Sequence, residues 1–494
     1  LPWQTIDDVL PYGAGNGTSG APYEVSTLAL LARLSAMPSE WGAGIYFALT
    51  ADIDASDTSA LNSGLGFSPI GNPTTPFQGS FEGNGHIISG LSINRPSQDF
   101  VGLFGYVDSG AIIQNIGLEG GSVTGRNYVG ALIGYNPTTI TSCYSTGTVS
   151  GGSSVGGLVG YNPGTTTSSY STGAVSGDNY YIGGLVGINS GTTTSCYAKG
   201  TVSGGNDVGG LVGYNSGTTT SSYSTGAVSG TSSVGGLGGN NAGTIMSCYS
   251  TGAVTGETNV GGFVGMNSDF ITSCYWDTDT SGHPSSAWGT GKTTLEMMQQ
   301  DTFVGFDFTT TPDWALFEGL TYPHLPWQNV DNVLLPYDAG DGTSGSPYEL
   351  STLGQLERLS IVPSEWAAGT YFELTANIDA SATSTWNSGL GFSPIGNLST
   401  PFQGSLEGNG YVISGLTLNR PSQDYVGLFG FAASGSIIQS LGLEGGSITG
   451  NDYVGGVVGY SNGSITACYS TNAVSGTNSI GGLVGSNDTG SIAS

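Results

Sequence analysis

The feature that most constrains this chain is a short phrase that recurs at an almost fixed distance. Val155–Asn162 reads Val-Gly-Gly-Leu-Val-Gly-Tyr-Asn, and related octets begin at positions 129, 155, 182, 208, 234 and 260. The steps between them are 26, 27, 26, 26 and 26 residues. This regularity predicts that each unit is one coil of a solenoid, because extra residues would disturb the stacking of neighbouring coils.

A second phrase lies between the octets and indicates that the coils are made of strands. Ser-Tyr-Ser-Thr-Gly-Ala-Val-Ser-Gly occurs at Ser169–Gly177 and again at Ser222–Gly230. Its β-branched and aromatic residues, bounded by Gly, Asn and Ser, are typical of short strands joined by tight turns. We therefore predict an all-β chain of stacked coils. The alternation of side chains along a strand does not by itself decide which residues of Val155–Val159 face inward.

A longer repeat contains the short one and predicts the domain organisation. Leu1-Pro2-Trp3-Gln4 returns as Leu325-Pro326-Trp327-Gln328, and the two halves then run parallel to the chain end. We expect a complete module at residues 1–324 and a truncated second copy at 325–494. Within the first module, residues 1–100 should hold a capping helix and irregular coils, 101–276 the regular coils, and 277–324 a terminating segment.

One helix is expected in each module. In Pro22–Ser35 either Ser26 or Thr27 can cap the N-terminus, and leucines recur on one helical face. The second copy keeps this face, and Glu357 and Arg358 are expected to point to water. A lone amphipathic helix at this place is suited to cover the open first coil. A shorter helix is predicted near Thr294–Gln299.

The two ends of the sequence lead to an expectation about assembly. The start resembles the tail of an earlier module, and the last residues stop inside a repeat. The chain is therefore interpreted as a window on a longer tandem array, or as a subunit that its neighbours complete. In a head-to-tail filament, Leu1–Pro11 and Ser479–Ser494 should be buried between subunits.

Charge excludes two classes of partner. Only 9% of residues are charged, and 35 acidic residues face 7 basic ones, for a net charge of −28. This field repels nucleic acids and anionic membrane surfaces. No apolar run approaches the roughly 20 residues that a membrane span needs, so no membrane insertion is expected.

The cysteines are predicted to be free, buried thiols. All five occupy the same place in the repeat, just before a tyrosine, and serine fills that place in other coils: Cys143, Cys196, Cys248, Cys274 and Cys468. Exchange with serine indicates a position that needs a small side chain. The spacings fit no zinc site.

The repeat resembles the GLUG-repeat proteins of bacterial and archaeal surfaces, whose Gly-Leu-any-Gly core appears here as Gly157-Leu158-Val159-Gly160. The phrases at Pro76–His86 and Gly291–Met297 also resemble the segments that flank such repeats. The resemblance implies a right-handed parallel β-helix in a large secreted adhesin. Such repeats also accompany some secreted peptidases, but no His-Glu-x-x-His occurs here.

An enzyme is not expected, although β-helices also include polysaccharide lyases and hydrolases, which remain the remote alternative. A glycosidase needs two carboxyl groups held across a groove, and the few acidic residues of the regular coils share no common position. Among the basic residues, Arg95 and Arg420 occur in a repeated phrase in which Asp99 or Asp424 can pair with them locally. We expect these arginines to be structural.

Calcium is the one cofactor that the sequence suggests, and none is required. Asp277, Asp279 and Ser281 place oxygen ligands at alternate positions before Gly282, like the start of a calcium loop. Trp288 stands where an EF-hand carries its last glutamate, so an EF-hand is excluded. The alternative is that these residues only form a turn.

Two columns of side chains are expected along the coils. One is a threonine ladder with the Thr-x-Thr spacing of ice-binding solenoids, predicted to decay at Ile140 and Ile245–Met246; its members are Thr165, Thr167, Thr192, Thr194, Thr218 and Thr220. Because threonine is also a good strand residue, strand formation alone could explain it. The other is a tyrosine column, expected to be a stacked spine rather than a sugar platform; its members are Tyr144, Tyr170, Tyr197, Tyr223, Tyr249 and Tyr275.

These inferences together predict an extracellular structural or adhesive repeat protein at the cell surface. It would form a semi-rigid rod, as part of a giant adhesin or as a filament subunit, with neighbouring modules or subunits as partners. Binding to carbohydrate, such as surface glycans, or to ice along the coil faces is the alternative.

Overall fold

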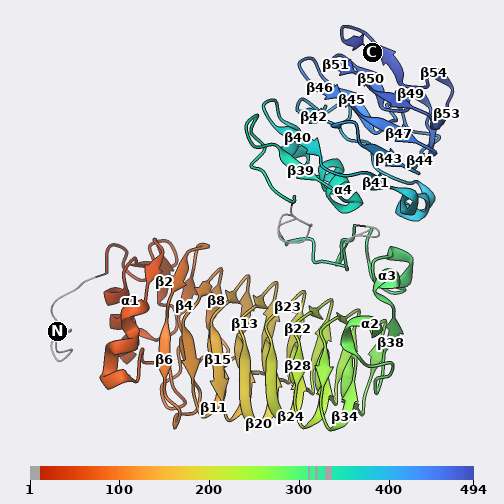
Figure 1. The fold of residues 1–494 in the computed structure, drawn as a ribbon. Coiled ribbons are helices and arrows are strands. Elements are labelled where there is room, and N and C mark those ends of the chain that lie inside the picture. The colour runs from red at the N-terminus through yellow and green to blue at the C-terminus, as the bar shows by residue number, and fades with distance from the viewer. Residues whose placement is uncertain (1–11, 310–311, 318–320, 329–336, 494) are drawn as a thin grey trace. The chain divides into compact units, whose positions relative to one another are not determined.

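The computed structural model of the chain describes residues 12–309, 312–317, 321–328 and 337–493. The chain divides into two compact units. Unit 1 comprises Leu1–Met297, Thr302–Ala315 and Leu325–Trp327, and unit 2 comprises Met298–Asp301, Leu316–His324 and Gln328–Ser494. Each unit is built around a stack of parallel coils (Figure 1).

Each regular coil of unit 1 contributes short strands to four sheets. In register, Val155 lies beside Ile182 and Tyr161 beside Ile188, one coil apart, and all of these pairings are parallel. One coil consists of β15 (Thr148–Gly151), β16 (Ser153–Gly156), β17 (Val159–Asn162), β18 (Thr165–Thr167) and β19 (Tyr170–Ser171). The repeat in the sequence is therefore the strand register, and the predicted all-β parallel β-helix is confirmed.

The four sheets of unit 1 run along the stack. The threonine sheet contains β18 with β1 (Tyr23–Val25), β2 (Tyr46–Leu49), β4 (Ser80–Glu82), β8 (Ile112–Gln114), β13 (Thr139–Thr141), β22 (Thr192–Thr194), β26 (Thr218–Thr220), β31 (Thr244–Met246) and β36 (Ile271–Thr272). The tyrosine sheet contains β19 with β3 (Ile53–Asp54), β5 (Ile87–Ser89), β9 (Gly117–Glu119), β14 (Tyr144–Ser145), β23 (Tyr197–Ala198), β27 (Tyr223–Ser224), β32 (Tyr249–Ser250), β37 (Tyr275–Asp277) and β38 (Thr290–Lys292).

The other two sheets carry the octets. The third contains β17 with β7 (Phe104–Tyr106), β12 (Ile133–Tyr135), β21 (Val186–Asn189), β25 (Val212–Asn215), β30 (Gly238–Asn241) and β35 (Val264–Asn267). The fourth contains β15 and β16 with β6 (Ser92–Asn94), β10 (Ser122–Thr124), β11 (Asn127–Gly130), β20 (Val175–Gly183), β24 (Val202–Gly209), β28 (Val228–Ser229), β29 (Ser232–Gly235), β33 (Val254–Thr255) and β34 (Thr258–Gly261).

The single 27-residue step is absorbed locally. Strand β20 pairs with β24 in two stretches, and the register shifts between Gly177 and Tyr180. The extra residue therefore makes a bulge, after which Ile182 returns to register with Val208. The bulge leaves Tyr180 49% exposed.

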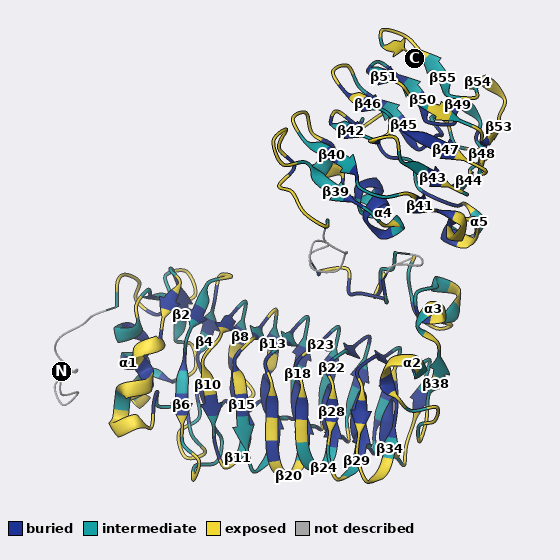
Figure 2. Cartoon of the chain, in the orientation of Figure 1, coloured by how far each residue is buried: buried dark blue, intermediate teal, exposed yellow. Residues whose placement is uncertain are grey.

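The octet places three apolar side chains in the core, because a corner separates its two strands. Val155, Leu158 and Val159 are all fully buried, so they do not follow the alternation of one continuous strand. At the corner, a Cβ on Gly157 would lie 2.2 Å from the carbonyl oxygen of Gly184 in the next coil. Glycine is therefore required where neighbouring backbones approach closely. Figure 2 shows the buried residues that line the inside of the stack.

A ladder of asparagine side chains runs through the core of unit 1. Each amide donates to the amide oxygen of the next coil at 2.8 or 2.9 Å, in the order Asn136, Asn162, Asn189, Asn215, Asn241 and Asn267. The second hydrogen of an amide also reaches a turn carbonyl, as from Asn189 to Thr218 at 3.0 Å. A buried amide needs such partners, so the ladder fixes the register of successive coils.

A helix covers the first coil of each unit, as predicted. These are α1 (Leu28–Ala36) and α4 (Leu353–Ile361), with Thr27 and Thr352 as N-caps. The first helix starts later than expected, because Tyr23–Val25 forms strand β1 and pairs with β2. Further short helices are α2 (Thr278–Ser281), α3 (Thr294–Met297), α5 (Trp386–Gly389), and the 3₁₀ helices η2 (Pro38–Glu40), η3 (Ser56–Gly64), η4 (Gln300–Thr302), η6 (Pro363–Trp366) and η7 (Ser381–Thr385). The short helix predicted near Thr294 is α3.

The expectation that Glu357 and Arg358 face water is wrong. Glu357 is 5% exposed, and the guanidinium of Arg358 pairs with Glu365 at 2.7 Å. The reason is that η6 folds back beside α4, and Tyr337 lies under the guanidinium at 5.0 Å. Unit 1 repeats this arrangement with Tyr12, Arg33 and Glu40.

Unit 2 repeats the early coils of unit 1. Its strands are β39 (Tyr348–Leu350), β40 (Tyr371–Leu374), β41 (Ile378–Asp379), β42 (Ser405–Glu407), β43 (Val412–Ser414), β44 (Thr417–Asn419), β45 (Phe429–Ala432), β46 (Ile437–Gln439), β47 (Gly442–Glu444), β48 (Ser447–Thr449), β49 (Asp452–Gly455), β50 (Val458–Ser461), β51 (Ser464–Thr466), β52 (Tyr469–Ser470), β53 (Ala473–Ser475), β54 (Asn478–Gly481), β55 (Val484–Asn487) and β56 (Ser491–Ala493). Residues 479–493 are mostly exposed. Leu1–Pro11 lies outside the described residues, so burial of both segments between subunits stays a prediction.

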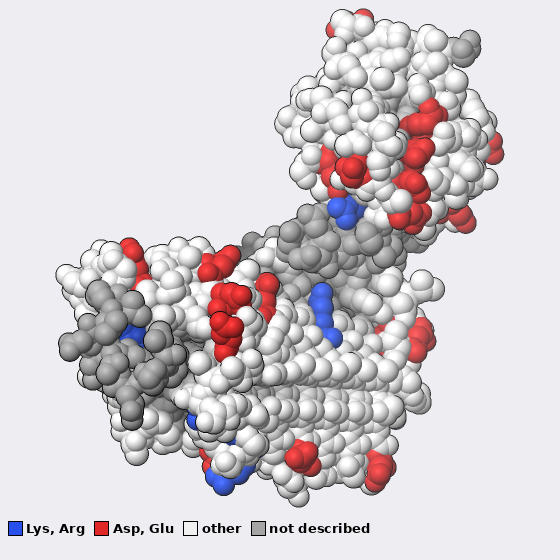
Figure 3. Space-filling model, turned by 60° about the vertical axis from the view of Figure 1, so that its left-hand side comes forward, with Lys and Arg blue, Asp and Glu red and all other residues white. Residues whose placement is uncertain are grey.

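The surface carries few charges, and most of them are acidic. On the face drawn in Figure 3, Asp and Glu side chains gather in separate groups, while broad areas of unit 1 carry no charged side chain. In the part of the chain that the structure describes, no helix has the length and apolar character needed to cross a membrane.

The thiols are free, as predicted. Cys143, Cys196, Cys248 and Cys274 are buried, and Cys468 is half-buried. Burial raises the pKa of Cys143 and of Cys196 to about 12. Serine fits the same position in other coils because its hydroxyl forms a hydrogen bond to the neighbouring coil. Ser169 Oγ accepts from the backbone N–H of Cys143 at 3.1 Å.

Replacing Asn189 with alanine should destabilise the chain by about 2 to 4 kcal/mol, because Asn162 and Asn215 would each lose a buried partner. Urea unfolding followed by near-ultraviolet circular dichroism measures the change in midpoint. Asn267→Ala is the matched control, because Asn267 ends the ladder and is partly exposed. Equal effects of the two substitutions would contradict a role of the ladder.

The buried thiols should resist alkylation in the folded chain at pH 8, because a raised pKa leaves little thiolate. We expect iodoacetamide to label Cys468 first and all five cysteines only in urea, as read by peptide mass spectrometry. The folded state prefers the protonated thiol, so the free energy of unfolding should fall as pH rises from about 9 toward 12. Rapid labelling of native Cys143 at pH 8 would refute this account.

Candidate binding surfaces

The predicted threonine ladder is a flat array on the outside of unit 1. In β18, β22 and β26 the first and third threonines are partly exposed, while the middle ones, Thr166, Thr193 and Thr219, are buried. The six candidate residues lie in register on three successive strands: one column is Thr165, Thr192 and Thr218, and the other is Thr167, Thr194 and Thr220. Within the array, Thr220 Oγ1 donates to Thr194 Oγ1 at 2.9 Å.

The array is larger than the sequence predicted. Ile140 and Ile245 do not interrupt it, because they occupy the buried middle position and pair with Thr166 and Thr219. The outer columns therefore continue through Thr139, Thr141 and Thr244. Between β13 and β31 the pattern breaks at Met246, so the predicted decay holds there but is wrong at Ile140 and Ile245. Binding of ice or a crystalline polysaccharide by this array stays a prediction.

The tyrosine column is a stacked spine, as the sequence suggested. Ring centroids lie 4.8 Å apart for Tyr144 and Tyr170, and 5.0 Å apart for Tyr223 and Tyr249, with nearly parallel planes. The four later rings are buried, with exposed fractions of 8% or less for Tyr197, Tyr223, Tyr249 and Tyr275. These rings are therefore closed to a sugar.

The cover of the column comes from the terminating segment and from the Leu-Pro-Trp phrase that follows it, both within unit 1. Trp314, itself fully buried, lies 5.5 Å from Tyr249, and Trp327 stacks on Tyr197 at 5.7 Å. Phe303 contacts both Tyr249 and Tyr275. The segment is tied down by polar contacts too, since Ser221 donates to Asp313 at 3.1 Å. The Leu-Pro-Trp phrase thus belongs partly to the cover of the preceding coils.

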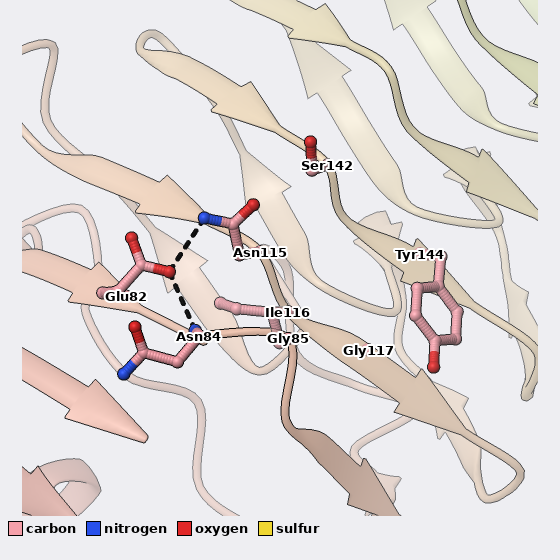
Figure 4. Close-up of a pocket in the computed structure, with 8 residues that line it drawn as sticks. All are labelled: Glu82, Asn84, Gly85, Asn115, Ile116, Gly117, Ser142 and Tyr144. Atoms are coloured by element: carbon pink, nitrogen blue, oxygen red, sulfur yellow. Dashed lines mark hydrogen bonds between the residues drawn. The ribbon is translucent and has the colours of Figure 1, made fainter. Parts of the chain in front are cut away.

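A hollow of about 580 Å³ opens where the tyrosine column begins. Figure 4 shows Glu82 turned toward Asn84 and Asn115, with Tyr144 on the other side. Glu82 Oε1 accepts from the backbone N–H of Asn84 at 2.8 Å and from Asn115 Nδ2 at 2.9 Å. Its other oxygen accepts from Gln114 at 2.6 Å.

The chemistry of this hollow is limited. Its remaining lining residues are Gly85, Ile116, Gly117 and Ser142, so Glu82 is its one carboxyl group. Burial and a hydrogen bond to Glu119 raise the pKa of Tyr144, which keeps the phenol protonated. A single carboxylate held by three donors lacks the second carboxyl group of a glycosidase.

The predicted calcium ligands form the start of helix α2. Asp277 is fully buried; its Oδ1 accepts from the backbone N–H groups of Asp279 and Thr280, and its Oδ2 from Thr294 Oγ1 at 2.7 Å. Asp279 accepts from the backbone N–H of Thr294 at 3.0 Å, and Ser281 donates to His283. Among the described residues there is no group of three or more His, Cys, Asp or Glu side chains arranged for a metal. Calcium at these residues stays a prediction.

The expected local pair between Arg95 and Asp99 does not form. Arg95 instead donates to the carbonyl of Phe67 at 3.0 Å and to Ser68 at 2.8 Å. Arg420 makes the same contacts with Phe392 and Ser393 in unit 2. Both arginines tie an early loop to its coil, which is structural, as expected. Asp99 pairs across coils with Arg126, because coil stacking brings residues 27 apart side by side.

A second aromatic surface was missed at the sequence level. It comprises five partly exposed rings, named here the outer aromatic cluster: Phe100, Tyr106, Tyr128, Tyr135 and Tyr161. Phe100 and Tyr128 stack at 4.8 Å, and Tyr106 and Tyr135 at 4.2 Å. The available signal was an aromatic residue directly before Val101 and Val129, the first residues of two coils.

A groove of about 480 Å³ lies on the same coils; none of the five rings lines it, but its lining residue Arg126 pairs with Asp99, which precedes Phe100. It is lined by Thr124, Arg126, Ser150, Ser176, Asp178 and Asn179 among others. Thr124 and Ser150 are hydrogen-bonded through their hydroxyls at 2.9 Å. The groove therefore offers hydroxyl and amide groups, and its residue Arg126 lies two positions before Tyr128 in the chain.

The model of the GLUG motif matches this chain at residues 125–150 and 178–203. These stretches fall in the regular coils, so the resemblance to GLUG-repeat proteins is confirmed. Halomucin of Haloquadratum walsbyi is 42% identical over 158 residues, which cover 31% of this chain and 2% of that protein. A protein of Evansella cellulosilytica named as a Gly-rich membrane protein is 36% identical over 129 residues, 25% of this chain and 14% of that one. The chain thus spans a small part of either relative.

Among solved structures, a protein from Bacteroides ovatus described as an immunoglobulin A1 protease is similar to 64% of this chain and 96% of its own chain. The TM-score is 0.43 and the sequence identity 21%. At these values the likeness carries no argument about activity.

Replacing Asp277 with alanine should cost about 1 to 2 kcal/mol, because the substitution removes the N-cap of α2. Thermal unfolding in calcium and in chelator measures this loss, with the exposed Asp279→Ala as the milder comparison. If the cap is the whole role of Asp277, chelator leaves the unfolding temperature of the native sequence unchanged. A drop in chelator that Asp277→Ala abolishes would instead establish a calcium site.

Proposed function

We propose that this chain of GLUG-motif coils is an extracellular structural and adhesive repeat, forming a rigid section of a large surface protein. The observation that carries the proposal is the continuous, in-register core of unit 1, in which each coil is hydrogen-bonded to the next along four sheets. Such a stack resists bending and extends by repetition.

The relatives support this proposal. Neither Halomucin nor the Gly-rich membrane protein is named as an enzyme, and the second is named as a membrane protein. The alignment with 2% of Halomucin is consistent with a repeat inside a much longer polypeptide. By this reading the chain is located at the cell surface, needs no cofactor, and has neighbouring modules as its main partners.

A non-catalytic role fits the surfaces described above. The hollow at Glu82 holds one carboxylate already occupied by three donors, and the basic residues Arg95 and Arg420 are engaged in loop contacts. The acidic surface favours solubility and repels nucleic acids.

Electron microscopy of the native, unproteolysed material tests the proposal. We expect long, uniform fibres or stalks that an antibody against unit 1 decorates at intervals on intact cells. At about 4.8 Å per coil and roughly ten coils, one module would contribute on the order of 50 Å of length. Denaturing electrophoresis of the antigen then distinguishes one giant chain from a filament of short subunits.

Decoration confined to the cytoplasm, or isolated short particles under all conditions, would overturn the proposal. Imaging in chelator adds a separate result. Loss of the fibres there would connect assembly to a divalent cation.

A further inference from the structure

We propose that the outer aromatic cluster and the groove on the same coils bind an uncharged polysaccharide. The inference deepens the adhesive part of the proposed function by assigning it a site and a ligand class. Five partly exposed rings form two rows, and the rows meet where Phe100 contacts Tyr106 at 5.4 Å. One row is Phe100 and Tyr128, and the other is Tyr106, Tyr135 and Tyr161. Tyrosine rings offer an apolar face together with a hydroxyl, which suits the alternating character of a sugar ring.

The cluster occurs twice in the chain. In unit 2 Tyr425 stacks on Tyr453 at 5.0 Å, and Phe431 stacks on Tyr460 at 4.9 Å. Phenylalanine and tyrosine exchange places between the copies, because Phe100 corresponds to Tyr425 and Tyr106 to Phe431. What is kept is the ring rather than the position of one hydroxyl. In the later coils of unit 1 a tilted contact recurs between Tyr181 and Tyr214 at 5.3 Å, while Asp207, Ser233 and Asn259 stand at the first ring position of the following coils, so the coil fold does not itself require the rings.

Four of the rings are carried by residues whose backbone conformation is energetically unfavourable. Phe100 and Tyr128 have φ of +59° and +56°, and Tyr425 and Tyr453 have φ of +60° and +58°. This left-handed region is unfavourable for bulky side chains. Other coils fill the same position with Ser154, Asp207, Ser233 and Asn259, and one coil has Tyr181 there, with φ of +65°. Strained residues of this kind concentrate where a protein uses them.

Polar groups border the rings and continue into the groove. Asp99, beside Phe100, accepts from Arg126 and from Asn127 Nδ2 at 3.1 Å. Arg126 also lines the groove, together with the hydroxyl column of Thr124 and Ser150. Rings with a few fixed polar groups are the usual composition of a small-molecule or sugar site.

The charge of this surface favours a neutral ligand. Arg126 is the cation of the groove, and its bond to Asp99 offsets its charge. Asp178 also lines the groove, so no net positive charge faces a ligand. With a net charge of −28 on the whole chain, sulfated or carboxylated polysaccharides are repelled.

Affinity electrophoresis of the full chain tests the assignment. Native gels containing hydroxyethyl cellulose, galactomannan or arabinoxylan should retard the chain with at least one polymer, while carboxymethyl cellulose should not. The test variant replaces Phe100, Tyr128, Tyr425 and Tyr453 with serine, the residue that holds the same backbone at Ser154 and Ser233. It should keep its circular dichroism spectrum and lose at least tenfold in affinity.

Tyr144→Ser is the matched control, because Tyr144 is a partly exposed ring outside the cluster. Retardation that survives the four serine substitutions, or that Tyr144→Ser abolishes, would overturn the proposal. So would retardation by carboxymethyl cellulose, or by none of the three neutral polymers. These results leave the fibres seen by electron microscopy unaffected, so failure of the glycan site and failure of the rod are distinguishable.

Discussion

The structure depends on one constraint, the stacking of each coil on the next without a shift in register. Parallel strands place equivalent residues roughly 4.8 Å apart, so an identical side chain on every coil becomes a continuous column. In the core this column is the asparagine ladder, whose amides are satisfied only when the coils align. Close backbone contacts at Gly157 and Gly160 leave no room for any other residue at the corners.

The same stacking constraint determines which side chains the outer surface of the coils presents. Any side chain that recurs on the outer positions forms a row, and unit 1 carries rows of threonine, tyrosine and mixed aromatic residues. The rows differ in how far their side chains are exposed to solvent. The tyrosine column is largely closed by Trp314 and Trp327, whereas the threonine array and the outer aromatic cluster remain partly exposed. Whether a row serves the packing of the fold or can contact a partner thus depends on whether another part of the chain covers it.

Much of this arrangement could be predicted because periodicity is a local property of the sequence. The 26-residue spacing predicted parallel coils, and the substitution of serine for cysteine predicted free thiols. The threonine columns were predicted too, but their extent was not, because Ile140 lies at a buried position between two outward threonines. The partial burial of Arg358 was missed for a similar reason, since Glu365 and Tyr337 reach it only through folding of the segments around the helix.

The sequence by itself determined the fold class, the repeat length, the register and the absence of crosslinks, since each follows from the identity and spacing of residues along one coil. Only the tertiary structure decided which rows are covered, how Asp99 and Arg126 meet, and where rings and groove combine. These features join residues on different coils or on the terminating segment. Their proximity depends on how the chain turns at each corner, and the corner within Val155–Val159 does not follow from simple alternation.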